Sequence, residues 1–275
     1  MSNDDGTGAA PMFNLAWGSA THTGNVRPLN EDALLADAPV FVVADGMGGH
    51  DAGEVASEMA VARFRGFVGM SAVAIHQVTP AITAANEAIV AAGEAGEGRA
   101  GMGTTIVGLI GVEQHGAPYW FAFNMGDSRI YRFCRGLLTQ VSVDHSHVQE
   151  LVTLGQLSPA AARLHPERNI ITRALGQQES GDPDYWLLPP EPGERFLLCS
   201  DGLSGELEPE EIARVLAAAP EPAVAAKNLL EAALFAGGRD NITVVVVDVL
   251  GIDTRAVDDQ SAWEQTTPRG DVFCE

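Results

Sequence analysis

Hydrophobic and β-branched residues form short continuous runs bounded by Gly, Asn, Asp or Pro. Runs of this length and composition are typical of strands, and continuous rather than alternating runs favour strands buried on both faces. The runs are residues 39–44, 104–110, 119–124, 195–199 and 242–247. They predict a β-rich core.

Other apolar residues recur at helical spacing. Three such faces lie within residues 56–67, 82–92 and 226–234, each with apolar positions three or four residues apart. Pro222 precedes the third face and Gly237 follows it, as expected at the two ends of a helix. Because helices follow helices and strands follow strands, strict β-α-β alternation is excluded. We expect an α+β sandwich with helices outside the strands.

Residues 144–176 interrupt this pattern. A short helical piece is predicted around residues 148–152, and a second begins at Ser158 and Pro159, a capping residue followed by proline at the first helical position. The segment therefore looks like an insertion between strands. Residues 1–12 and 253–275 are mostly polar with few apolar anchors, so we expect flexible tails on either side of one domain at 13–252.

Composition narrows the class of protein. The 275 residues are 46% hydrophobic, which is enough for a substantial core, and 16 basic against 37 acidic residues give a net charge of −21. This charge and the lack of a basic stripe argue against nucleic-acid and membrane partners. Three scattered cysteines and an acidic N-terminus fit neither a disulfide framework nor a signal peptide. We expect a cytoplasmic monomer.

Four aspartates lie where strands meet turns: Asp45, Asp127, Asp201 and Asp240. Any one of them alone is typical of an ordinary turn. Adjacent strand ends can gather several carboxylates at one rim of a sheet, however, and such a cluster needs a cation to offset the repulsion. Oxygen ligands without Cys or paired His favour Mg²⁺ or Mn²⁺ over zinc.

Six short motifs contain these aspartates, precede the first of them or lie between them in the chain. They are residues 24–32 (GNVRPLNED), 43–50 (VADGMGGH), 101–105 (GMGTT), 126–129 (GDSR), 198–203 (LCSDGL) and 238–243 (GRDNIT). In this order they resemble the metal-dependent Ser/Thr protein phosphatase family, also called protein phosphatase 2C, in its bacterial form. The resemblance covers about residues 13–250.

The resemblance implies two antiparallel sheets flanked by paired helices, with a two-metal site at one end. Asp45 would bridge both ions, while Asp201 and Asp240 would hold the first ion. The Gly46 carbonyl and Glu31 would serve the second ion, beside which Asp32 would order waters. Asp127, together with Asp201, would hold a third and weaker ion.

The resemblance also implies a reaction. Arg27 would grip the substrate phosphate, which suits a planar fork of donors. Water between two Mg²⁺ or Mn²⁺ ions loses its proton near neutral pH, so a metal-bridging hydroxide could attack phosphorus without a protein nucleophile. Phosphoserine and phosphothreonine in proteins are the expected substrates, and a bacterial Ser/Thr kinase is the expected opposing partner.

Met47 marks a departure from many eukaryotic members, which carry a histidine there as a proposed general acid. Metal-bound water or His50 could supply that proton instead, although His50 fits a turn equally well. His145 and His147 form a lone His-x-His, which is more often polar surface than a metal site, so we assign them no role. Residues 144–176 resemble the flap of the bacterial enzymes, which would shape access for phosphoproteins.

Two other classes of function remain open at this point. A pseudophosphatase would keep the fold as a phosphoprotein-binding module, but the full set of Asp45, Asp201 and Asp240 favours an enzyme. A metal-dependent phosphodiesterase or nuclease is weakened by the absence of basic stripes and stacking aromatics.

Overall fold

Two β-sheets stack face to face at the centre of the molecule. The structure is a computed structural model of the chain that describes residues 12–48, 52–96, 101–178 and 180–253. The first sheet has the order β1 (Phe13–His22), β12 (Ile242–Ile252), β11 (Arg195–Cys199), β8 (Arg129–Cys134) and β9 (Leu137–Gln140). The second has the order β10 (Asp184–Leu188), β7 (Ala117–Met125), β6 (Ile106–Gln114), β3 (Val40–Met47) and β2 (Asp32–Asp37).

Strand pairing in both sheets is antiparallel along these paths, as expected from the sequence. Two short strands lie off the path of the second sheet, where β5 (Gly103–Thr104) pairs antiparallel with β3. The other, β4 (Val73–Ala74), runs parallel to β6 and is an exception to the antiparallel prediction.

Strands β3 and β12 are buried on both faces, which explains their continuous hydrophobic runs. In β3, Phe41 and Val43 pack between the sheets, whereas Val42 packs toward the helices. In β12, Val245 lies between the sheets and Val246 faces the other helices. The sandwich thus has three apolar layers, one between the sheets and one under each pair of helices.

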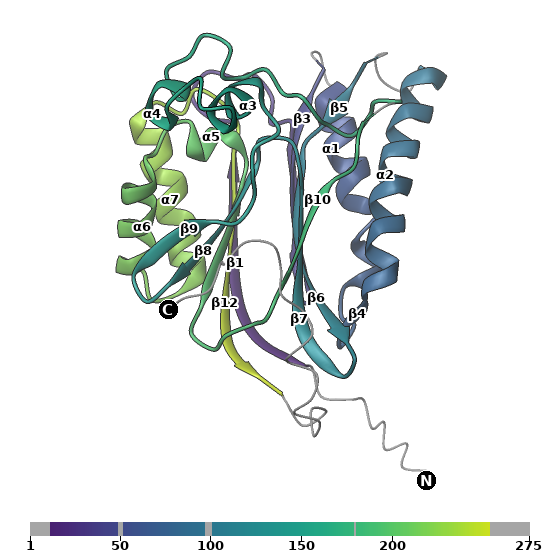
Figure 1. Ribbon diagram of the computed structural model, residues 1–275, viewed down its shortest axis with the longest axis vertical. Coiled ribbons are helices and arrows are strands. Elements are labelled where there is room, and N and C mark those ends of the chain that lie inside the picture. Colours follow the sequence, from purple (N-terminus) through teal and green to yellow (C-terminus); the bar gives the residue numbers. More distant parts are fainter. Residues whose placement is uncertain (1–11, 49–51, 97–100, 179, 254–275) are drawn as a thin grey trace.

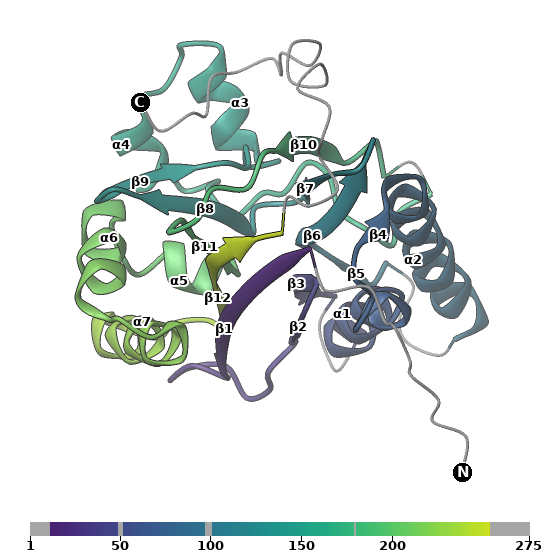
Figure 2. The same cartoon turned by 90° about the horizontal axis from the view of Figure 1, so that it is seen from below.

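Helices cover both outer faces, as Figures 1 and 2 show. On one side lie α1 (Ala52–Ala62) and α2 (Ile75–Ala95), and on the other lie α6 (Pro209–Ala218) and α7 (Pro222–Ala236). This arrangement confirms the predicted α+β sandwich. The predicted helical face at 56–67 is too long, because α1 ends at Ala62 and a 3₁₀ turn, Arg65–Phe67, follows it. Phe64 is nevertheless fully buried. Its hydrophobic character therefore reflects a buried position and not membership of the helix.

The predicted insertion lies between β9 and β10 and contains α3 (His147–Thr153) and α4 (Pro159–Ala162). The hydroxyl of Ser158 accepts the backbone N–H of Ala161 at 3.2 Å, so the predicted cap is present. In Figure 1 both helices lie at the top of the sandwich, together with the short α5 (Asp201–Ser204). The two predicted tails fall almost entirely on 1–11 and 254–275, which lie outside the described residues, and His50 does as well.

Candidate metal centre

Two of the predicted site carboxylates stand opposite each other on neighbouring strands. Asp32 begins β2 and pairs in register with Asp45 near the end of β3. Side chains of a cross-strand pair point to the same face, and like charges directly opposite are destabilising. The Asp32 carboxylate is steadied by Ser200, whose hydroxyl donates to Oδ2 at 2.8 Å. This pair is the centre of the candidate site.

Two further strand ends bring Asp201 and Asp127 to the same place. Asp201 follows β11 and is the first residue of α5, and its carboxyl group repels that of Asp45 electrostatically. Asp127 follows β7, is only 8% exposed, and repels both Asp45 and Asp201 electrostatically. The sheets therefore gather four aspartates that are far apart in the sequence.

Glu31 and Gly46 are held together by backbone contacts. The N–H of Gly46 donates to the carbonyl of Glu31 at 3.1 Å, and the Ser57 hydroxyl donates to the same carbonyl at 2.6 Å. The Glu31 carboxylate lies over Gly53 at the start of α1, so close that a Cβ at Gly53 would come within 2.5 Å of Oε1. Gly53 thus leaves the space that this carboxylate occupies.

Asp240 completes the acidic cluster from the loop before β12, where it meets Arg27. The Arg27 Nη2 lies 2.6 Å from Oδ2 of Asp240, and both side chains are partly exposed. Asn241 ties the two segments together: its Nδ2 donates to the carbonyls of Thr23 and Leu29, and its Oδ1 accepts the Glu31 N–H, all at 2.8 Å. Arg27 is therefore placed beside the aspartates by a well-bonded loop.

Crowding of these carboxylates changes their pKa values. Desolvation by burial, together with neighbouring aspartates, raises the pKa of Asp32 to about 7 and that of Asp201 to about 6. The same two causes raise the pKa values of Asp45 and Asp127 well above their usual range. Divalent cations bound among these four carboxyl groups would offset their repulsion and favour the ionised form of each.

The donor set fits hard divalent ions. Among the described residues, Glu31 Oε1 and Asp32 Oδ1 are buried oxygens without a hydrogen-bond partner, and carboxylate and carbonyl oxygens are the ligands that Mg²⁺ and Mn²⁺ prefer. As the described side chains stand, no three His, Cys, Asp or Glu groups converge tightly enough to hold an ion without adjustment. Asp240 is an example, because its carboxylate forms an ion pair with Arg27 and would have to turn to reach an ion. The individual ligand roles therefore stay predictions.

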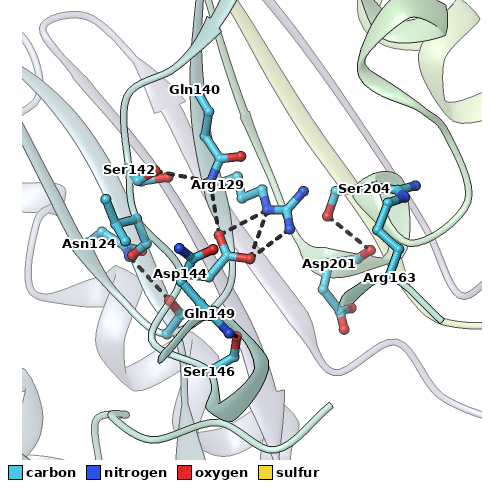
Figure 3. A network of polar contacts seen from close by, with 12 residues as sticks. Asn124, Arg129, Gln140, Ser142, Asp144, Ser146, Gln149, Arg163, Asp201 and Ser204 are labelled. Atoms are coloured by element: carbon cyan, nitrogen blue, oxygen red, sulfur yellow. Dashed lines mark hydrogen bonds and ion pairs between the residues drawn. The ribbon is translucent and has the colours of Figure 1, made fainter. Parts of the chain in front are cut away.

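A cleft of about 730 Å³ opens from Asp127 and Asp201 between the insertion and the loop that joins α5 to α6. Arg129 crosses one side of it and grips Asp144 with three contacts of 2.6–3.1 Å, to which Gln140 adds another at 3.0 Å (Figure 3). On the other side Arg163 donates to Glu208 at 2.9 Å and so ties the insertion to α6. The cleft adjoins the aspartates and is large enough for a segment of polypeptide.

Three residues that contribute to this site have no role in the sequence prediction. Asn241 and Ser200 lie inside two of the six motifs, directly next to Asp240 and Asp201. Their position beside a predicted ligand could have identified them as part of the site. His145 is only 6% exposed, so its interpretation as polar surface is wrong, whereas His147 is partly exposed and pairs with Glu167 at 3.3 Å. No pattern in the sequence distinguishes the two histidines.

Comparison with known proteins agrees with this geometry. The family described as "Protein phosphatase 2C" matches residues 22–234. A serine/threonine protein phosphatase, PstP, of Mycobacterium tuberculosis is 39% identical over 249 residues, which cover 87% of this chain and 46% of the relative. This chain thus spans about half the length of that relative. A serine/threonine phosphatase, stp, of Listeria monocytogenes is 35% identical over 246 residues and is covered to 93%.

Solved structures show the same similarity. The crystal structure of the M. tuberculosis phosphatase PstP/Ppp superposes with a TM-score of 0.79 at 38% identity, covering 86% of this chain and 99% of that one. The PstP catalytic domain in complex with two manganese ions gives a TM-score of 0.78 at 37% identity, with the same coverage. From its motifs, its fold and these similarities, the chain belongs to the protein phosphatase 2C family.

Proposed function

We propose that this protein hydrolyses phosphoserine and phosphothreonine in phosphoproteins and that the reaction requires two Mn²⁺ or Mg²⁺ ions, with a third ion held more weakly. The relatives named above are serine/threonine phosphatases, and one of their structures contains two manganese ions. Both facts describe those relatives. The residues of this chain support the same activity here.

The observation that carries the proposal is the cross-strand pair of Asp32 and Asp45, with Asp201 near enough to repel both carboxylates. Such a cluster is unfavourable for folding alone, because desolvation and mutual repulsion both oppose ionisation. In the proposed arrangement Asp45 would serve both ions, Asp201 and Asp240 would hold one, and the Gly46 carbonyl and Glu31 would hold the other. Asp127 and Asp201 would hold the third.

The residues around the cluster have separate tasks. Arg27, fixed at its edge by Asp240, would bind two oxygens of the phosphate with its planar fork. Asp32 has a buried oxygen free to accept a hydrogen bond from water. When bound, the ions would supply charge neutralisation for the phosphate dianion and a water acidified enough to act as the nucleophile.

The cleft beside Asp127 and Asp201 would receive the polypeptide around the phosphorylated residue, and the insertion at 144–176 would act as its flap. The expected partner in a cell is a Ser/Thr kinase, and cytoplasmic location and a monomeric state belong to the same proposal. Among the described residues, no helix is long and apolar enough to cross a membrane. The binding-module alternative is not supported, since the relatives are phosphatases and Asp45 is surrounded by the charges of four other aspartates, as an ion-binding cluster would require.

Hydrolysis of p-nitrophenyl phosphate and of a phosphothreonine peptide tests the proposal directly. We expect turnover with Mn²⁺, none in excess EDTA, and none for Asp45→Asn with Mn²⁺. Asp37→Asn is the matched control, because Asp37 is an exposed aspartate at the far end of the same strand pair and should leave turnover unchanged. Turnover by Asp45→Asn, or by wild type in EDTA, would overturn the metal-dependent mechanism.

A further inference from the structure

Gly126 is the last residue before Asp127, and its backbone groups have left the sheet. The final pair of the β6–β7 ladder is Ile106 with Met125, and Gly126 turns away with φ of +114°. A Cβ there would come within 2.6 Å of Thr105, so the turn is both left-handed and tightly packed. Its N–H and C=O need partners elsewhere if the turn is to keep its direction.

His145 supplies a partner for each group. Its backbone N–H donates to the Gly126 carbonyl at 2.8 Å, and its ring Nδ1 accepts the Gly126 N–H at 3.2 Å. With Nδ1 as an acceptor, a neutral ring carries its proton on Nε2, which lies 3.2 Å from Oδ2 of Asp184 and 3.3 Å from Nη1 of Arg173. Arg173 donates to the other oxygen of Asp184 at 3.2 Å and so holds that carboxylate in place.

The same histidine lies at the neck of the flap. Thr172 at the end of the insertion donates its N–H to the His145 carbonyl at 2.8 Å, and Ser146 pairs with Ile171 in a short antiparallel bridge. His145 therefore connects three parts of the chain: its ring contacts the turn that presents Asp127 and the start of β10, and its backbone carbonyl holds the base of the flap.

We infer that His145 is a positioning residue, whose ring fixes the turn at Gly126 and so aims the Asp127 carboxylate at the site beside Asp201. The inference rests on the proposed function, in which Asp127 helps to hold the third ion. A residue that orients a metal ligand through a hydrogen bond commonly changes metal affinity or activity by about 10–100-fold when it is removed.

Three substitutions separate this role from general packing. His145→Ala removes the ring acceptor, whereas His145→Asn keeps an oxygen at the position of Nδ1 and His145→Gln places its acceptor one bond farther out. His147→Ala is the matched control two residues away, because its side chain is partly exposed and pairs only with Glu167 among the described residues. The backbone hydrogen bonds of residue 145 are unchanged in all the variants.

Calorimetric titration with Mn²⁺ is the first readout, and kcat and KM for p-nitrophenyl phosphate are the second. We expect His145→Ala and His145→Gln to weaken the lowest-affinity Mn²⁺ site about tenfold or more and to lower kcat to a similar degree, with little change in KM. His145→Asn should recover most of both losses. Equal losses for the Ala and Asn variants, or wild-type Mn²⁺ binding by the Ala variant, would overturn the inference.

The ring tautomer gives a test that needs no variant and no metal. Nitrogen-15 NMR of the metal-free wild-type protein should show His145 protonated on Nε2 and not on Nδ1, and a proton on Nδ1 would contradict the positioning role even if His145→Ala fails to fold. Wild-type hydrolysis is measured in parallel: if it is absent, the proposed function fails, while the titration and the tautomer still decide the role of His145.

Discussion

Arg27 shows how a single side chain in this site can be placed without adding much stability. Its ion pair with Asp240 is short, yet the two side chains are 50% and 34% exposed. Exposed ion pairs contribute about 0–1 kcal/mol to stability, so the contact matters mainly for position. The hydrogen bond to Asp240 and the charges of Asp240, Asp201 and Asp45 raise the pKa of Arg27, so its guanidinium carries a firm positive charge at the edge where a phosphate would bind.

Replacement of Arg27 should therefore affect substrate binding more than turnover. We expect Arg27→Ala to raise KM for a phosphothreonine peptide by a factor that corresponds to about 1.5–3 kcal/mol, with a smaller change in kcat. Arg27→Lys should recover only part, because an ammonium group cannot form the same fork of hydrogen bonds. Arg63→Ala, which alters an exposed arginine just after α1, is the control. An unchanged KM for Arg27→Ala would remove Arg27 from the phosphate site.

Asn241 links three segments, and its loss should be felt in both stability and binding. Asn241→Ala removes partners from the Glu31 N–H and from the carbonyls of Thr23 and Leu29. We expect a loss of about 1–3 kcal/mol in the free energy of unfolding, measured in urea, and a raised KM because the loop that carries Arg27 loses its anchor. Asn25→Ala removes two bonds from an exposed side chain and should cost less. Equal losses would show that Asn241 has no special role.

At the scale of elements, the sandwich depends on a glycine in the layer between the second sheet and the helices that cover it. Gly108 in β6 lies opposite Phe123 in β7, and a Cβ on Gly108 would come within 2.1 Å of the Phe123 ring. That ring in turn stacks on Phe64 from the α1 side, with centroids 5.5 Å apart. The missing side chain thus makes room for an aromatic stack that joins the sheet to its helices.

Filling that space should loosen the stack. We expect Gly108→Ala to lower the free energy of unfolding by about 1–3 kcal/mol, because an overpacked core forces the ring out of its preferred rotamer. Gly66→Ala is the matched control, since nothing lies within 4 Å of a Cβ there and the backbone is not left-handed. Denaturant unfolding of both variants checks the pair, and a Gly108→Ala variant as stable as wild type would contradict this account of the packing.

The elements differ in how far the sequence predicts them. Strands β3 and β12 are recognisable because burial on both faces leaves an unbroken hydrophobic run. Strand β1 is not, because it mixes exposed and buried positions without strict alternation. The residues of the site differ in the same way. Each Asp at a strand end can be recognised from the local sequence, but the approach of Asp201 to Asp45 depends on the pairing of distant strands, and only the motif resemblance predicted it.

At the scale of the whole molecule, the acidic cluster opposes folding until cations arrive. The chain carries a net charge of −21, and its buried aspartates lie together at one end of the sandwich rather than dispersed over the surface. Anything that binds the folded state alone stabilises it by mass action, and divalent ions that require ionised carboxylates do so more strongly as pH rises. Metal loading and stability should therefore be coupled through pH.

The coupling has a definite sign in the metal-free protein. The folded pKa values of Asp32, about 7, and Asp201, about 6, lie above those of the unfolded chain, which are near 4. Between pH 4 and 7 the folded state therefore holds protons that the unfolded chain has released, and these groups make stability fall as pH rises, by up to about 1.4 kcal/mol per pH unit for each proton.

Urea unfolding at pH 5 and pH 7.5, in EDTA and in saturating Mn²⁺, measures this effect, and Asp32→Asn isolates the contribution of one group from that of other titrating residues. Because the amide cannot ionise, Asp32→Asn should gain stability relative to wild type between pH 5 and pH 7.5 in EDTA, by on the order of 2 kcal/mol, and should be the more stable protein at pH 7.5. In Mn²⁺ the order should reverse at pH 7.5, since the ions stabilise the ionised cluster of the wild type and the amide weakens their surroundings. If the stability difference in EDTA does not change between the two pH values, Asp32 ionises without cost in the folded protein, and the acidic cluster is not the source of the metal dependence.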